Sequence, residues 1–173
     1  MILTGPKIKE QVGAKTITIS PFHDKYINPN SYDFRLGSTL LVYKDKILDS
    51  KSKNETETIT IPDDGYVLQP DILYLGHSVE TIGSDVYVPI LRGKSSTGRM
   101  GLFVHITADL IDIGSLGTFT LMLHTVQPLR VYPGMRIGQV TFWKTVGNVN
   151  LYAGKYQGSA LPMASQVYKD FEK

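Results

Sequence analysis

Short apolar runs that alternate with polar residues fill most of the chain, and Gly, Pro or acidic pairs separate them. Runs of this length, rich in β-branched and aromatic residues, predict β-strands. The strands are expected at residues 15–19, 39–43, 57–61, 71–82, 85–93, 101–107, 117–124, 129–144 and 149–155. Dense apolar residues between 137 and 143 indicate a strand that is buried on both faces.

Helical signals appear in only two places. Residues 4–12 have Thr4 as an N-cap candidate and a proline in the first turn. Residues 95–101 can form one helical turn, with Ser95 as its cap. Polar residues 49–57 predict the loop of a hairpin. The many short strands predict an all-β architecture, either a barrel or a double-sheet sandwich.

Composition narrows the class of protein. A chain of 173 residues is long enough for one domain with a real core, here expected to span 1–173. The absence of cysteine excludes disulfides, thiolate metal sites and cysteine nucleophiles. No run resembles a signal peptide or a membrane span, so we expect a cytoplasmic protein without membrane contact. A net charge of +2 and a single Trp argue against a nucleic-acid partner.

The charge is unevenly distributed. No Asp or Glu occurs between Ile113 and Lys169, whereas that segment contains two arginines and two lysines. Such a segment should attract an anion, for example a phosphate group. Acidic residues at 55–57 and 62–65 would cancel this attraction if they fold over the segment.

The segment 92–101, "RGKSSTGRMG", combines glycines, two serines, a threonine and several cations. Glycine allows close approach of the backbone to a ligand, and Arg99 can bind an anion bidentately. The order of Gly, Lys and hydroxyl residues is not that of a Walker motif. A phosphate site and a solvated basic turn both remain open on this chemistry.

Other polar residues allow structural interpretations. Asp33 and Arg35 alternate along one strand, which favours an ion pair on one face. The four histidines lack metal-ligand spacing, and His105 and His124 lie in apolar strands, where a hydrogen-bonded core histidine is common. The Gly-rich tail at 154–171 is either a mobile flap over a ligand or a frayed terminus.

Taken in order, these segments resemble the dCTP deaminase branch of the trimeric dUTPase superfamily. The resemblance covers nearly the whole chain and rests on "MILTGPKI", "INPNSYDFRLG", "VYVPILRGKSSTGRMGLFVHITADLIDIGSLG", "PLRVYPGMRIGQVTF" and "KYQG". It implies a distorted β-barrel or jelly-roll-like fold of the dUTPase type. It also implies a homotrimer with active sites between subunits, and a deoxynucleoside triphosphate ligand whose Mg²⁺ is held through the phosphates, with no metal ligand from the protein.

The resemblance assigns roles to the loop and the tail. The family pattern in the loop is Arg-Ser-Ser with an Arg three residues later, and here a Lys occupies the first position. The tail, 154–173, corresponds to a flap over the triphosphate. The implied triphosphate-binding residues are Lys94, Ser95, Ser96, Arg99, Lys155, Tyr156 and Gln157. Arg99 would also support the catalytic end of the site.

Asp112 matches the acid of the family's Ile-Asp-Pro-Gly-aromatic turn. By resemblance it contacts the sugar 3′-hydroxyl and, in dUTPases, orients the water that attacks the α-phosphate. One orienting carboxylate suffices for that step, because metal and cations stabilise the phosphate charge. The implied residues at the base and sugar are Thr107, Ala108, Asp112 and Gly117.

Two positions depart from the deaminase pattern. The deaminases have a Glu ten residues beyond the turn Asp, and this chain has Met122 there. A thioether cannot accept or deliver the proton that deamination requires. His124, two residues on, shares that strand face. Ser115 replaces the aromatic residue that stacks on the deoxyribose.

The lack of an acid at position 122 favours a phosphohydrolase that splits dUTP, or a related deoxynucleoside triphosphate, to the monophosphate and pyrophosphate, whereas Met122 and Ser115 together favour a homologue without turnover. Hydrolysis retains Asp112, Arg99 and the phosphate-binding residues, and it needs no acid at position 122. One alternative is a dCTP deaminase with a relocated proton carrier. The other is a nucleotide-binding homologue without turnover.

Overall fold

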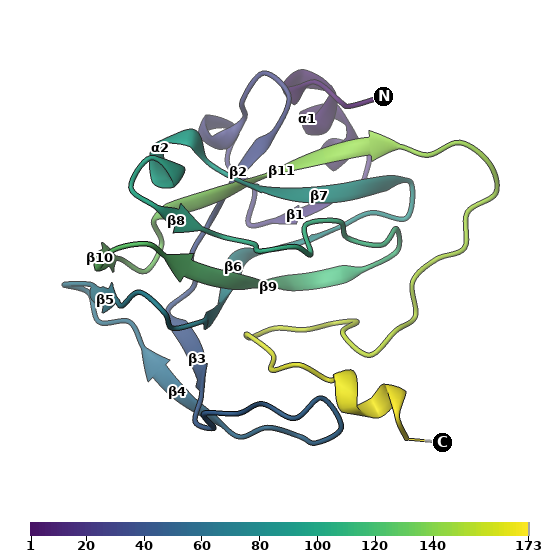
Figure 1. Cartoon of the computed structure of the whole chain (residues 1–173). Coiled ribbons are helices and arrows are strands. Elements are labelled where there is room, and N and C mark those ends of the chain that lie inside the picture. Colours follow the sequence, from purple (N-terminus) through teal and green to yellow (C-terminus); the bar gives the residue numbers. More distant parts are fainter. Residues whose placement is uncertain (173) are drawn as a thin grey trace.

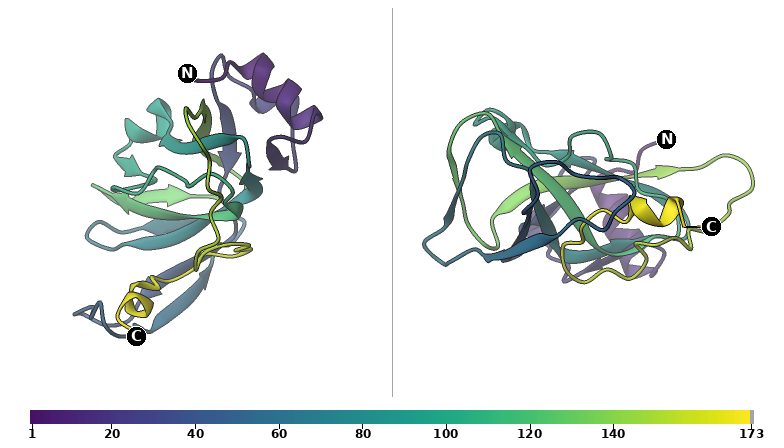
Figure 2. Two further views of the ribbon diagram at one scale, coloured as in Figure 1. Left: turned by 90° about the vertical axis from the view of Figure 1, so that its right-hand side faces the viewer. Right: turned by 60° about the horizontal axis from the view of Figure 1, so that its bottom comes forward.

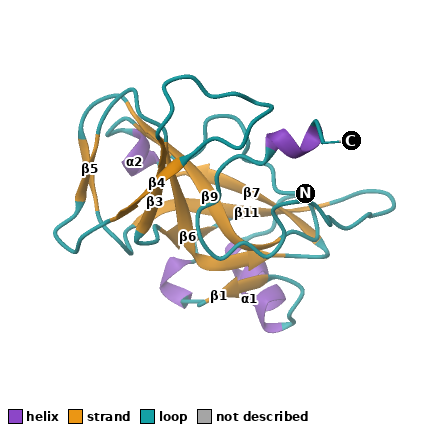
Figure 3. Ribbon diagram, turned by 90° about the horizontal axis from the view of Figure 1, so that it is seen from below, coloured by secondary structure: helices purple, strands orange, loops and turns teal. Residues whose placement is uncertain are grey.

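The computed structural model describes residues 1–172, and most of its elements are strands of antiparallel sheets (Figure 1; Figure 3). The largest sheet has the strand order β4-β3-β6-β9-β8, with β1 paired to β6. Its strands are β1 (Thr18–Ser20), β3 (Thr39–Tyr43), β4 (Thr56–Thr60), β6 (Tyr74–Gly83), β8 (Leu102–Phe103) and β9 (Leu116–Thr125). Because β9 pairs with both β6 and β8, it lies inside this sheet.

A second sheet has three strands in the order β2-β11-β7. They are β2 (Tyr32–Arg35), β7 (Tyr87–Gly93) and β11 (Arg136–Lys144). The central strand β11 buries Ile137, Val140 and Phe142, but Trp143 is exposed, so the predicted burial on both faces is wrong. A two-stranded ribbon pairs β5 (Tyr66–Leu68) with β10 (Leu129–Val131).

The apolar side chains of the two main sheets form one core. Tyr32 and Phe34 of β2 are fully buried, as are Leu121 and Leu123 of β9. Burial raises the pKa of the Tyr32 phenol to about 12, and its oxygen accepts a hydrogen bond from the His23 N–H at 3.0 Å. Burial of each apolar side chain of this size stabilises the fold by roughly 1.5–3 kcal/mol. The predicted all-β class and dUTPase-type fold are confirmed.

Four short helical elements lie at the periphery (Figure 3). They are α1 (Gly5–Gly13), η1 (Asp24–Tyr26), α2 (Ser95–Gly98) and η2 (Val167–Asp170). Thr4 is the N-cap of α1, although its side chain makes no capping hydrogen bond. The predicted cap of α2 is wrong, because Lys94 holds the N-cap position and Ser95 is the first helical residue. Among residues 1–172, no helix is long and apolar enough to cross a bilayer.

Three strand predictions are wrong. Of the run 101–107, only Leu102–Phe103 forms a strand, β8. The run 129–144 is two strands, because the turn at 132–135, which contains Pro133 and Gly134 at φ +75°, interrupts it. Residues 149–155 form no strand: they lead into the tail, and only Tyr152 N donates across, to the Ile113 carbonyl at 2.8 Å. A β-rich composition without a neighbouring strand edge is insufficient for a strand.

The tail docks along the outer edge of the hairpin that leads into β9. Gly158 N donates to Leu116 O at 2.9 Å, and Thr118 N donates to Ser159 O at 2.8 Å. Farther along, Ser165 N donates to the Tyr43 hydroxyl of β3 at 2.8 Å. Figure 2 shows the resulting path, in which the tail passes beside the hairpin and ends near β3 and β4.

The expected ion pair between Asp33 and Arg35 does not form. The Arg35 backbone N–H and its Nε both donate to the carboxylate of Glu80, at 2.8 Å and 2.7 Å. Glu80 is fully buried in β6, so this pair ties the second sheet to the first across the core. The alternation of side chains predicts on which face of β2 Arg35 lies. It does not predict that β6, with Glu80, lies opposite that face.

Replacing Glu80 by Ala should destabilise the fold by about 3–5 kcal/mol, because Arg35 would retain a charge beneath the surface without a partner. Urea denaturation measures the change in the free energy of unfolding. Glu10→Ala is the matched control: its pair with Lys7 is solvent-exposed, so its loss should cost at most about 1 kcal/mol. Equal midpoints for the two variants would contradict a structural role for the Glu80 pair.

Candidate active site

A cavity of about 430 Å³ lies between β9, the hairpin before it and the tail. This volume is in the range that holds a small-molecule ligand. Four of the predicted site residues line it, namely Ala108, Asp112, Gly117 and Tyr156. Thr107 instead lines a smaller neighbouring cavity, together with Arg92 and Asp109.

One face of β9 forms the floor of the cavity. Thr118, Thr120 and Met122 alternate along the strand and all line the cavity. Their neighbours Leu121 and Leu123 point into the core, as the period of two requires. Position 122, where the deaminases of the family carry their acid, therefore faces the ligand space.

The hairpin presents the carboxylate at its turn. Ser115 N donates to Asp112 O at 3.1 Å, and Gly114 adopts a positive φ of +89° that favours glycine. The Asp112 side chain is exposed, and Asp112 supplies the one carboxylate among the described residues that line this cavity. Ser115 and Leu116 both line the cavity, so Leu116 supplies apolar surface near the position of the missing aromatic ring.

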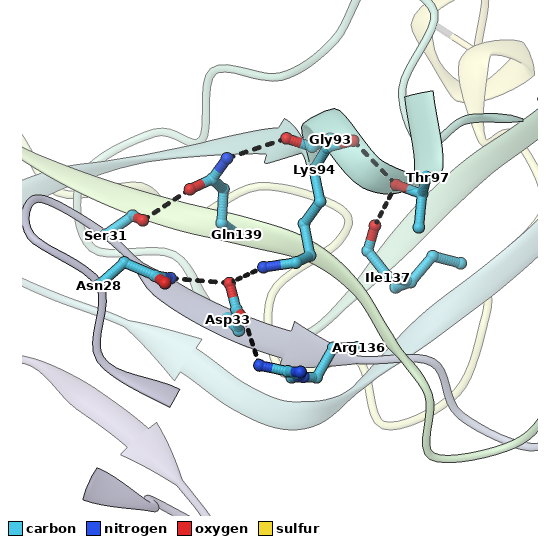
Figure 4. Close-up of polar contacts among 9 residues, drawn as sticks. All are labelled: Asn28, Ser31, Asp33, Gly93, Lys94, Thr97, Arg136, Ile137 and Gln139. Carbon is cyan, nitrogen blue, oxygen red and sulfur yellow. Dashed lines mark hydrogen bonds and ion pairs between the residues drawn. The ribbon is translucent and has the colours of Figure 1, made fainter. Parts of the chain in front are cut away.

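The basic loop is anchored from below by Asp33 (Figure 4). The Asp33 carboxylate is 1% exposed, and it accepts hydrogen bonds from Lys94 Nζ at 2.5 Å and from Asn28 Nδ2 at 2.7 Å. Arg136 adds a longer contact of 3.3 Å. Lys94 is thus turned inward, whereas Ser95, Ser96 and Arg99 are exposed.

The basic loop and the cavity are separate in one chain. None of Lys94, Ser95, Ser96 and Arg99 lines the cavity that holds Asp112. In Figure 1 the loop at α2 and the tail lie at different ends of β9. A single copy therefore does not bring the predicted phosphate-binding loop to the predicted catalytic carboxylate.

The tail residues contribute in different ways. Gln157 bridges the hairpin, since its Oε1 accepts from Leu116 N at 3.0 Å and its Nε2 donates to Gly114 O at 2.9 Å. Lys155 donates to Asp170 at 2.6 Å, and this hydrogen bond raises the pKa of its ammonium group. Tyr156 lines the cavity. Gly117 faces the tail closely, because a Cβ there would lie 2.7 Å from Ser159 O.

His105 is the residue that sequence reasoning misjudged. It lines the cavity, and among the described residues neither of its ring nitrogens has a hydrogen-bond partner although both are buried. Burial lowers the pKa of its imidazole to about 4. The apolar context of "GLFVHIT" indicated a hydrogen-bonded core histidine in a strand, and this is wrong: His105 is half-buried, lies outside the strands, and its ring makes no hydrogen bond within the described residues.

The donor groups determine how a metal could bind. Among residues 1–172, no three His, Asp or Glu side chains are grouped closely enough to hold a metal ion. The cavity offers Asp112 as a single oxygen donor of that type. Such a site fits a Mg²⁺ ion that takes most of its ligands from nucleotide phosphates.

Comparison with known proteins identifies the chain's relatives. A family model described as dCTP deaminase-like matches residues 2–145. A protein of Clostridium beijerinckii named "dCTP deaminase, dUMP-forming" is 48% identical over the full length of both chains. A protein of the same name from Cytophaga hutchinsonii is 45% identical, again over the full length of both.

A solved structure supports the same fold. The 2′-deoxycytidine 5′-triphosphate deaminase of Agrobacterium tumefaciens superposes with a TM-score of 0.65 at 22% identity. The match covers 82% of this chain and 47% of the other, so this chain spans about half the length of that protein. At this identity the likeness shows the fold alone.

These names overturn the interpretation of the chain as a dUTP pyrophosphohydrolase, since full-length relatives at 45–48% identity are named dCTP deaminases. The classification as a dUTPase-like hydrolase is wrong for the same reason. The interpretation as a hydrolase rested on the lack of an acid at position 122. The chain belongs to the dCTP deaminase-like family.

Proposed function

We propose that this chain converts dCTP to dUMP, with release of ammonia and pyrophosphate. The observation that carries the proposal is the end-to-end similarity, at 48% identity, to a dUMP-forming dCTP deaminase. The cavity supports the proposal, because Asp112 and one face of β9 line the same space. The sugar and the base of a single nucleotide would therefore both lie in it.

Asp112 is the proposed catalytic carboxylate for the phosphate step. Its exposed side chain can accept a hydrogen bond from the sugar 3′-hydroxyl and orient a water toward the α-phosphate. Ala108 and Gly117 line the same cavity and are proposed to surround the base and sugar, whereas Thr107 faces the smaller neighbouring cavity. A Mg²⁺ ion held by the triphosphate would neutralise part of the charge that develops there.

The triphosphate is proposed to bind at the basic loop and the tail. Ser95, Ser96 and Arg99 are exposed, and a guanidinium can bind two phosphate oxygens at once. Lys94 is expected to hold the loop in place through Asp33 rather than to contact phosphate directly, since its ammonium is already paired. Lys155, Tyr156 and Gln157 would then cover the phosphates from the tail.

Because one chain keeps its basic loop away from its own cavity, we propose a homotrimer in which each site combines the loop of one copy with the hairpin of the next. Closed cyclic symmetry gives every copy the same pair of surfaces. Exposed apolar side chains near the cavity, including Phe103 and Ile106, would be covered in such an assembly.

A second candidate is a protein that binds the nucleotide without deaminating it. Met122 favours it, since a thioether carries no proton and faces the cavity. Incubation of the purified protein with dCTP and Mg²⁺, followed by assays for ammonia, dUMP and pyrophosphate, separates the two candidates. Binding of dCTP without ammonia would support the second and overturn the first.

Asp112→Asn should lower dUMP formation from dCTP by roughly 100-fold or more, since an amide cannot act as a base toward water. If Asp112 serves only the phosphate step, the variant should accumulate dUTP while ammonia is still released. Chromatography of the nucleotides measures both products. The control is Asp63→Asn, an exposed loop carboxylate that is remote from the cavity lining. Unchanged dUMP formation in Asp112→Asn would exclude the water-orienting role.

Mixing two inactive variants tests the shared site. Arg99→Ala and Asp112→Asn chains, refolded together in equal amounts, should regain roughly a quarter of the wild-type rate, because random assortment leaves that share of sites intact. Light scattering should give a mass three times that of one chain. A mixture of Ser96→Ala with Arg99→Ala should regain nothing, because both changes affect the same loop. No recovery in the first mixture would contradict a site built from two copies.

A further inference from the structure

Deamination of a cytosine ring needs a group that carries protons between water, the ring and the leaving amine. Of the described residues that line the cavity, Asp112 is the one carboxylate, and it sits at the hairpin turn. Position 122 on the cavity floor is a thioether. If dCTP is deaminated here, another cavity side chain must carry the proton.

His105 lies beside that position. Met122 N donates to the Val104 carbonyl at 3.1 Å, so the segment that contains His105 runs directly alongside Met122. Both side chains line the same cavity. The two ring nitrogens of His105 are buried and lack a hydrogen-bond partner within residues 1–172. A buried polar atom without a partner is costly, and a ligand that supplies the partner removes that cost.

Two of the other histidines show the contrast. The ring of His77 makes a 2.9 Å hydrogen bond through Nδ1 with the Ser78 carbonyl. Its Nε2 is also buried without a partner among the described residues, but it packs against Gly37 and does not line the cavity. His124 shares a strand face with Met122, but its ring lies against Phe103 with centroids 6.2 Å apart, and it does not line the cavity. His124 therefore shares the strand face of Met122, as the sequence predicts, but its ring is not placed to act on a ligand in the cavity.

We propose that the imidazole of His105 is the proton carrier of deamination, in the role that a carboxylic acid at position 122 would otherwise fill. This inference rests on the proposed conversion of dCTP. The imidazole takes a proton from the water that bonds to C4 of cytosine and passes it to N3. It then takes the proton of the new C4 hydroxyl and gives it to the amino group. The C4–N bond breaks, its electron pair leaves with ammonia, and uracil remains.

The charge state of His105 suits this role. Burial lowers its pKa to about 4, against a smaller opposing effect of the Asp109 carboxylate. Asp109 is itself paired with Arg92 at 2.5 Å, and Asp112 is the other charged side chain at the cavity. The imidazole is therefore neutral at pH 7 and can accept a proton.

The test uses the purified full-length protein with dCTP and Mg²⁺, and measures ammonia release and dCTP binding. His105→Asn should lower the rate of ammonia release by roughly 10²–10⁴-fold, the usual loss on removing a general acid–base group. Its dissociation constant for dCTP should change by less than about threefold, because the side chain keeps a polar atom of similar size. His124→Asn is the matched control and should keep the wild-type rate.

A second variant distinguishes the loss of a proton carrier from misfolding. The double variant His105→Asn with Met122→Glu should regain ammonia release, because it restores a proton carrier to the same cavity wall. In the wild type, ammonia release should fall as pH drops toward 4 and stay level above about pH 5, since protonated imidazole cannot accept a proton.

The outcomes separate the two proposals. Wild-type turnover with an equally active His105→Asn variant would overturn the role of His105 and leave the proposed function standing. A wild type that binds dCTP but releases no ammonia would overturn the proposed function and the inference together. A large loss in His105→Asn with unchanged dCTP binding and recovery in the double variant would support both.

Discussion

The placement of the basic loop depends on one buried carboxylate, that of Asp33. This group lies in β2, and it draws the N-cap residue of α2 and the first residue of β11 toward it (Figure 4). A carboxylate that is 1% exposed is tolerable only because two cations and an amide surround it. Because of this ion pair, the Lys94 side chain points inward. The serines and Arg99 that follow are consequently held at the surface, where an anion can reach them.

The second constraint is the alternation of β9. One set of its side chains fills the core, and the other set forms the cavity floor, so no residue of this strand can change faces without cost to the fold. The tail is a further constraint, on the outer side of the hairpin. The carbonyl of Leu116 and the N–H of Thr118 already form hydrogen bonds with the tail, so they are not free to bind a base. A base that enters the cavity must therefore be read mainly by the remaining hairpin groups and by the side chains of the floor and the opposite wall.

Much of this arrangement could be predicted from the sequence, and most of the failures share one cause. The run 39–43 became β3 with its predicted bounds, and the first helix formed within one residue of its predicted position. Local periodicity determines such elements. The partner of Arg35 and the lack of a strand at 149–155 depend on which segments meet in space. The split of 129–144 is different, because the Pro133-Gly134 turn that causes it is a local signal. The placement of Ala108, Asp112, Gly117 and Tyr156 around one cavity followed from family motifs, whereas the distance of Ser95, Ser96 and Arg99 from that cavity required coordinates.

The replacement of an acid by Met122 has a physical consequence for its neighbours. A carboxylate on the cavity floor would add charge beside His105, which would raise the imidazole pKa and give its ring a hydrogen-bond partner. With a thioether there, burial is the larger influence on the imidazole pKa of His105, and the Asp109 carboxylate opposes it only in part. The same substitution that removes a proton carrier therefore leaves a second group neutral, unpaired and able to accept a proton. The chemistry of positions 105 and 122 is therefore coupled, because both residues line one cavity and the backbone segments that carry them are hydrogen-bonded to each other.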